Sequence, residues 1–81
     1  MARVVITPAV AALSPGLPAE IEVEAANLHQ LATRLDRAFP GAGAVLANKA
    51  ALAIDGTVTA DWSTALTPDS EVMVVPKISG G

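Results

Sequence analysis

The stretch from residue 27 to residue 41, NLHQLATRLDRAFPG, decides the fold class, because its apolar residues recur with the period of an α-helix. Asn27 stands where an N-cap is expected, and Gln30 can complete a capping box three residues on. Pro40 and Gly41 end the helix, since proline disfavours helical geometry in the residue before it. The apolar positions share one helical face: Leu28, Leu31, Ala32, Leu35 and Phe39.

Two strand-forming segments precede this helix. Residues 2–7 form a β-rich run that stops at Pro8. Residues 20–25, EIEVEA, alternate glutamate with apolar residues, which is typical of a strand with one face in water. Prolines are dense in the intervening segment, residues 8–19, and predict a loop or a wide hairpin connection.

A hairpin and a final strand follow the helix. Residues 52–60, LAIDGTVTA, predict a hairpin around Asp55-Gly56, the pair favoured in two-residue type I′ turns. Residues 71–77, EVMVVPK, predict the last strand, whereas residues 41–51 indicate at most a short helical turn. The order predicts an α+β fold, with a mixed sheet of about four to five strands and one main helix across one face.

Length, charge and cysteine content narrow the function classes. The chain has 81 residues, which gives one small domain without room for a deep catalytic cleft. Its net charge of −3 argues against a nucleic-acid partner, and its apolar runs are far shorter than the ~20 residues that span a membrane. The absence of cysteine excludes a disulfide framework and a thiolate site. It agrees with a cytoplasmic location, and the first residues do not resemble a signal peptide.

Few side chains are candidates for chemistry. His29, the only histidine, is expected in solvent on the polar side of the helix, with no second metal ligand at i+3 or i+4. Trp62 is expected to cap the end of the core rather than to form a ligand platform. Gly41 to Gly43 lack the flanking strand and helix of a phosphate loop. We therefore expect this chain to bind no metal or cofactor itself.

The chain ends on Gly80 and Gly81 directly after a strand-forming run. At average glycine usage such a pair arises by chance about once in 200 chains, and a frayed end or a cloning remnant would also explain it. A tail without side chains can pass through a channel where a Cβ would clash. Its reactive group is the Gly81 carboxylate, which needs activation before a sulfur or amine nucleophile can attack it. Adenylation by ATP supplies this activation, with ATP and its metal ion bound at a separate enzyme.

The last strand is apolar on both faces, because residues 72–75 read VMVV. A strand with one wet face should alternate. One interpretation is a central strand whose outer side is covered by the proline-rich loop. The other is a docking surface beside the tail.

The ending ALTPDSEVMVVPKISGG, residues 65–81, resembles that of the MoaD/ThiS family of ubiquitin-like sulfur carriers. The β-β-α opening and the AIDGTV hairpin extend the resemblance over nearly the whole chain. It implies a ubiquitin-like β-grasp domain over residues 1–78 and a flexible Ser-Gly-Gly tail over 79–81. The matching positions are Leu66, Asp69, Glu71-Val72, Pro76 and Gly80-Gly81.

The resemblance also implies chemistry and partners. An E1-like adenylating enzyme would adenylate Gly81, which then becomes a thiocarboxylate. The tail residues Ile78, Ser79 and Gly80 would thread the enzyme's channel. Val72 and Val74 would face the core. The partner-docking residues would be Met73, Val75, Pro76 and Lys77.

Under this interpretation the chain is a carrier rather than an enzyme, and its sulfur acceptor is the large subunit of molybdopterin synthase or an equivalent. Residues 5–16 and 39–46 are more similar to carriers for cysteine or thioamide biosynthesis, so cysteine, thiamine or another thio-metabolite is an alternative destination. A ubiquitin-like modifier that joins Gly81 to a lysine would use the same activation. A plain β-grasp interaction module would not need the free carboxylate.

Overall fold

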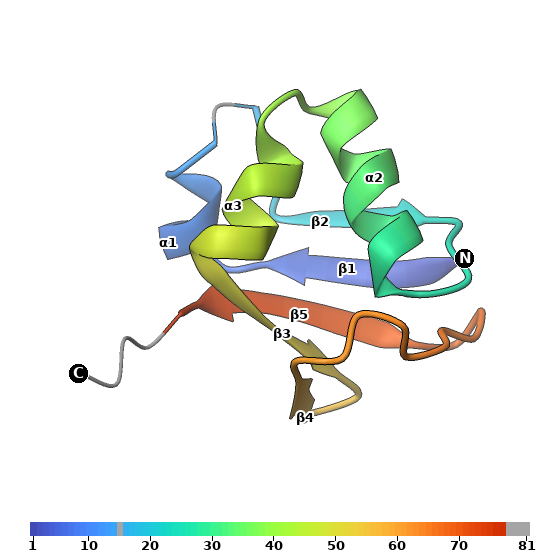
Figure 1. The fold of residues 1–81 in the computed structure, drawn as a ribbon. Helices are drawn as coiled ribbons and strands as arrows, with labels where there is room; N and C mark the ends of the chain where they lie inside the picture. Colours follow the sequence, from blue (N-terminus) through green and yellow to red (C-terminus); the bar gives the residue numbers. More distant parts are fainter. Residues whose placement is uncertain (15, 78–81) are drawn as a thin grey trace.

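The computed structural model describes residues 1–14 and 16–77, in which helices pack against one mixed sheet (Figure 1). The tail positions Ile78 to Gly81 lie outside the described residues. In chain order the elements are β1 (Ala2–Ile6), α1 (Pro8–Ala11), β2 (Glu20–Val23), α2 (Leu28–Ala38), α3 (Ala42–Asn48), β3 (Ala50–Ile54), β4 (Thr57–Thr59) and β5 (Glu71–Pro76).

The strands form one five-stranded mixed sheet with the order β2-β1-β5-β3-β4. β5 pairs in parallel with β1 and antiparallel with β3, and the two outer pairings are antiparallel. The mixed sheet expected from the sequence is therefore confirmed. The last strand of the chain takes the central position, which agrees with its apolar residues on both faces.

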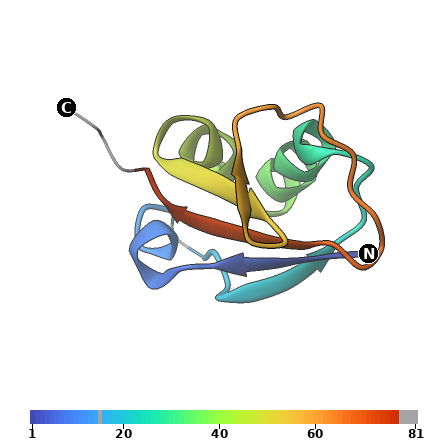
Figure 2. The ribbon, with the colours of Figure 1, turned by 90° about the horizontal axis from the view of Figure 1, so that it is seen from below.

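α2 lies across one face of this sheet and buries the expected stripe except for Phe39, which is the half-buried C-cap (Figure 2). Leu28, Leu31 and Leu35 are at most 1% exposed. The Asn27 side chain accepts a hydrogen bond from the Gln30 amide at 2.9 Å, as an N-cap should. The Gln30 side chain accepts from the amide of Ala26 at 3.0 Å, one residue before the position that a capping box would use.

Two further helices were not expected from the sequence. The proline-rich segment contains α1, because Pro8 fits the first turn of a helix, where no amide partner is needed. Val10 of α1 is fully buried, so tertiary packing stabilises a helix of only four residues. The predicted turn after α2 is the seven-residue helix α3, which packs beside α2 on the same side of the sheet (Figure 2).

The side chain of Asp36 in α2 accepts hydrogen bonds from backbone amides at the start of α3. Its Oδ1 accepts hydrogen bonds from the amides of Gly41 and Gly43, each at 3.1 Å. These amides belong to the start of α3, where no intrahelical acceptor exists. Gly41 has φ 98°, a left-handed conformation that glycine adopts without steric cost.

The β3–β4 hairpin has the predicted turn. Asp55 and Gly56 have φ 50° and 89°, the positive values that a type I′ turn requires. The Asp55 side chain also accepts from the Glu71 amide at 2.9 Å, which fixes the turn to the start of β5. β4 is three residues long and pairs with residues 52–54, so the start of β3 has no partner from β4.

We expect Asp36→Ala to lower the free energy of unfolding by about 0.5–2 kcal/mol, the usual effect of losing a capping side chain. Two amides of α3 would lose their acceptor. Thermal denaturation measures the change. Asp69→Ala, which removes an exposed carboxylate in a turn, is the matched control and should stay within about 0.5 kcal/mol. Equal effects of the two variants would contradict the capping role.

Candidate functional site

The candidate site begins where β5 ends and the carboxy-terminal residues follow. The Val74 carbonyl accepts hydrogen bonds from the Thr7 amide at 3.1 Å and from Thr7 Oγ1 at 2.9 Å. The Lys77 amide donates to the Lys49 carbonyl at 3.0 Å. The point from which the tail departs is therefore held from both sides, by residues next to α1 and α3. Gly81, Gly80, Ser79 and Ile78 themselves fall outside the described residues.

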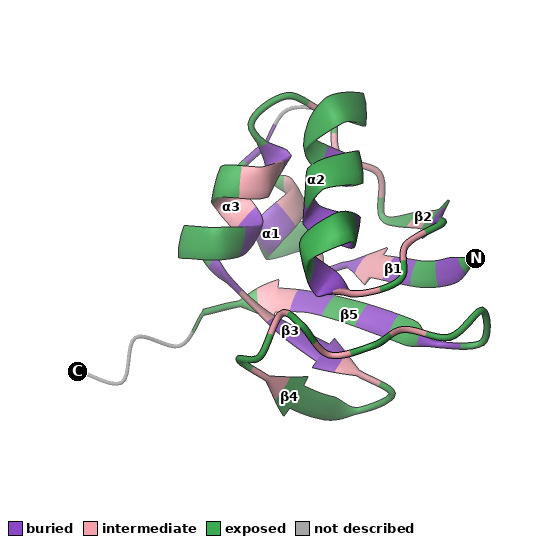
Figure 3. Ribbon diagram, turned by 45° about the vertical axis from the view of Figure 1, so that its right-hand side comes forward, coloured by how far each residue is buried: buried purple, intermediate pink, exposed green. Residues whose placement is uncertain are grey.

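β5 alternates between the core and the opposite face of the sheet (Figure 3). Val72 and Val74 are fully buried, and Met73 is 39% exposed. The assignment of the two valines to the core is confirmed. Val75 has the same parity as Met73 and is half-buried.

The strand register extends this outer side into an apolar face. Met73 pairs with Val5 on one side and with Ala53 on the other. Ala53 pairs in turn with Val58, which is 66% exposed. The apolar face, as the term is used below, consists of Val5, Ala51, Ala53, Val58, Met73 and Val75.

The first interpretation of the apolar strand is correct for its central position only, and docking on its outer side stays a prediction. β5 is central, but the proline-rich segment does not cover its outer side, because α1 directs Val10 into the core. Met73 and Val75 lie on the apolar face, whereas Pro76 pairs with Ala50 and has the parity of the core-facing residues. Pro76 and Lys77 are exposed at the end of the sheet, so the four expected docking residues divide between a face and an end.

A charged row borders the apolar face at the end of the sheet away from the tail. Arg3 pairs across the sheet with Glu22 on β2 and with Glu71 on β5. Its guanidinium lies 2.6 Å from a Glu20 oxygen and 3.8 Å from a Glu71 oxygen. The hydrogen bond and the charge of Glu20 raise the pKa of Arg3 above its usual value. The charged row, as we define it, comprises Arg3, Glu20, Glu22 and Glu71.

The sequence analysis missed most of the apolar face. Val5, Ala51, Ala53 and Val58 come from three strands and share no sequence motif. Val58 carried one signal, since it is a large apolar residue between two threonines in a short strand. The pairing that brings these residues together connects positions far apart in the chain.

A hollow of about 660 Å³ lies at the start of β3, on the side where β4 does not pair with it, and beside α3. Trp62 lines it and packs against the core, as expected of a capping residue. The exposed His29 ring meets the Trp62 ring edge-on, with 5.7 Å between centroids. Asp61 also lines the hollow, and hydrogen bonds from Ser63 lower the pKa of its carboxyl group. These polar groups remain at the rim of an apolar hollow.

Within residues 1–14 and 16–77, histidine, aspartate and glutamate side chains do not gather in groups of three that could hold a metal ion. The helices in this part of the chain are too short or too polar to cross a membrane. Comparisons with protein-family models and with curated proteins found no match for the chain.

Proposed function

We propose that the chain is a ubiquitin-like sulfur carrier of the MoaD/ThiS type with a β-grasp fold. The observation that carries the proposal is the position of β5, a central strand that continues in sequence into Gly80-Gly81. The parallel β1–β5 pair at the centre of a mixed sheet, with α2 across one face, supports the β-grasp assignment. The exposed apolar face beside the tail supports docking to a larger protein.

The proposed chemistry takes place at Gly81. Its carboxylate attacks the α-phosphorus of ATP, and the bond to the departing pyrophosphate breaks, which leaves an acyl-adenylate. A persulfide sulfur then attacks the acyl carbon, and AMP leaves with the electron pair of the broken C–O bond. A thiol reductant cleaves the resulting acyl disulfide and releases the thiocarboxylate. The chain itself has no cysteine, so the sulfur is carried on the terminal carbonyl.

Each proposed residue has one role. Ile78, Ser79 and Gly80 thread the channel of the E1-like adenylating enzyme, which binds ATP and the metal ion. Met73 and Val75 dock against that enzyme, while Pro76 and Lys77 flank the channel entrance. The carrier does not catalyse the reaction. Since the reaction consumes ATP, the proposal places it in the cytoplasm.

We assign the sulfur first to molybdopterin synthesis, with the large synthase subunit as acceptor. Carriers for cysteine, thiamine or another thio-metabolite are the alternative, because residues 5–16 and 39–46 depart from the molybdopterin type. A protein modifier is the second candidate class, and it shares the activation step. Lysine conjugates of the chain in cell extract would favour the modifier.

Intact-mass analysis tests the proposal. Incubation with an E1-like enzyme from the same cell, ATP, a persulfide donor and a thiol should replace one oxygen of the protein by one sulfur. Fragmentation should place the sulfur on Gly81. Omitting ATP and deleting Gly81 are the controls, and both should prevent the change. If every such enzyme of that cell leaves the mass unchanged, the sulfur-carrier function is wrong.

A further inference from the structure

The face of the sheet opposite the helices is negatively charged at one end and positively charged at the other. Arg3, Glu22 and Glu71 of the charged row lie side by side at the start of β5, and Glu20 lies on the β2 edge opposite Val5. The row contains three glutamates and one arginine, which gives a net charge of −2. Lys49 and Lys77, both exposed, lie at the other end, where the Lys77 amide bonds the Lys49 carbonyl. Glu71 and Lys77 are six positions apart, which corresponds to about 20 Å at ~3.3 Å per residue.

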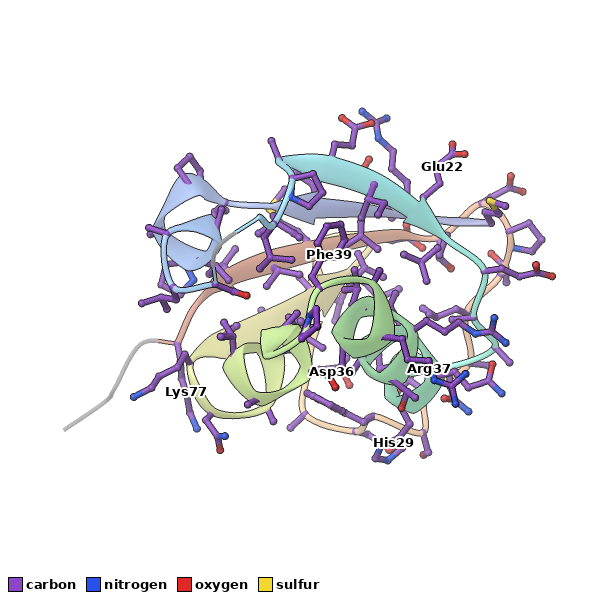
Figure 4. The ribbon with its side chains drawn as sticks, turned by 90° about the horizontal axis from the view of Figure 1, so that it is seen from above. Glu22, His29, Asp36, Arg37, Phe39 and Lys77 are labelled. Carbon is purple, nitrogen blue, oxygen red and sulfur yellow. The ribbon has the colours of Figure 1, made fainter. Side chains whose placement is uncertain are left out.

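The charged row is accessible to a partner. The side chains of Arg3, Glu20 and Glu71 are 52%, 50% and 48% exposed. Glu22 points away from the helix layer, and Lys77 lies far from it at the tail end of the sheet (Figure 4). The single arginine contacts Glu20 closely and Glu71 more loosely, so the negative charge of the row is only partly neutralised.

The apolar face lies between these two ends. Along β5, Glu71 of the charged row is followed on the same side by Met73 and Val75, and Lys77 comes next at this parity. A protein that covers the apolar face must therefore meet negative charge at one end and positive charge at the other. Charges at the rim of an interface affect the rate and the orientation of docking more than the final affinity.

We propose that the protein docking on the apolar face is the adenylating enzyme, and that its surface is basic opposite the charged row and acidic beside the mouth of its tail channel. This inference rests on the proposed function. The two complementary ends turn the carrier so that its tail meets the channel rather than the opposite side of the enzyme. A docked carrier with reversed orientation would place like charges together at both ends.

Association kinetics test this arrangement. The probe is the adenylating enzyme that thiocarboxylates the wild-type chain, with rates measured at low and high salt. At low salt, the double variant Glu22→Gln and Glu71→Gln should associate about tenfold more slowly, within the 10–10³-fold range of electrostatic steering. It keeps the close Arg3–Glu20 pair and brings the row to zero net charge. Its rate should also depend less on salt than the wild-type rate does.

Two matched controls separate local charge from total charge. Asp36→Asn removes one negative charge in the helix layer and keeps an oxygen that can accept from the Gly41 and Gly43 amides. It should leave the association rate within about twofold, because Asp36 lies away from the apolar face and the charged row (Figure 4). Lys49→Gln should slow association, whereas Arg37→Gln should not, since Arg37 points away from the sheet (Figure 4). Circular dichroism confirms that each variant is folded before its rates are compared.

The outcomes distinguish this inference from the proposed function. Thiocarboxylation of the wild type with salt-independent association would overturn the inference and leave the carrier function standing. Equal slowing by Asp36→Asn and by single Glu22→Gln would also overturn it, because total charge would then explain the effect. If the wild type is not thiocarboxylated at all, both proposals fail together.

Discussion

Gly80→Ala should slow thiocarboxylation of Gly81 by about a hundredfold or more while leaving the melting temperature unchanged. The added Cβ would meet the wall of the enzyme channel, and a displacement of about 1 Å at a reacting group can reduce a rate by that factor. The core cluster of the described residues ends at Val74, and the described hydrogen bonds of this strand extend to Lys77. The substitution should therefore affect the transfer reaction rather than the fold.

A time course of intact mass measures this rate, and thermal denaturation measures the fold. Ser79→Ala is the matched control, because position 79 already carries a Cβ and the variant adds no volume. It should react within a few-fold of the wild-type rate. If Gly80→Ala loses several degrees of melting temperature, Gly80 has a structural role and the channel argument is wrong.

Val74→Ala and Val75→Asp should separate stability from docking. Val74 is fully buried in the core cluster, so its truncation should lower the free energy of unfolding by about 1–3 kcal/mol. In a domain of this size each kcal/mol lowers the melting temperature by about 4–8 °C. Val74→Ala should still be thiocarboxylated at temperatures where it is folded.

Val75→Asp should weaken docking rather than stability, because Val75 lies on the apolar face beside Ala51. The aspartate can reach solvent on that side, while a docked partner would have to bury its charge. We expect near wild-type stability and a large loss of affinity for the adenylating enzyme, measured by titration. Met73→Asp, at a position 39% exposed, should repeat this result. Unfolding of Val75→Asp together with full stability of Val74→Ala would contradict the assigned faces.

The sequence predicted those elements that are stabilised by contacts between residues close together in the chain. The stripe and cap of α2 were readable because residues three and four apart share a helical face and because Asn27 bonds the Gln30 amide within one turn. The hairpin was readable because Asp55-Gly56 tolerates positive φ at both positions. The alternation of β5 was readable once one valine was assigned to the core.

The residues of the candidate site also fall into two groups, those that the sequence predicted and those that only the structure brought together. The proposed role of Gly80 and Gly81 came from the sequence, because it depends on the absence of side chains at these two positions. Met73 and Val75 followed from strand parity once the resemblance had placed Val72 and Val74 in the core. Val5, Ala51 and Val58 did not, since they join the apolar face only through pairing with β5 and β3.

By itself the sequence determined an amphipathic helix and a type I′ hairpin, which depend on contacts within a few residues, and it indicated an apolar last strand. Only the tertiary structure decided that β5 lies between β1 and β3, that α1 and α3 are helices, and that an apolar face separates a charged row from two lysines. Strand order and register connect distant positions, and α1 exists because the core buries Val10. Their energies come from packing between segments, and the local residue pattern does not contain that information.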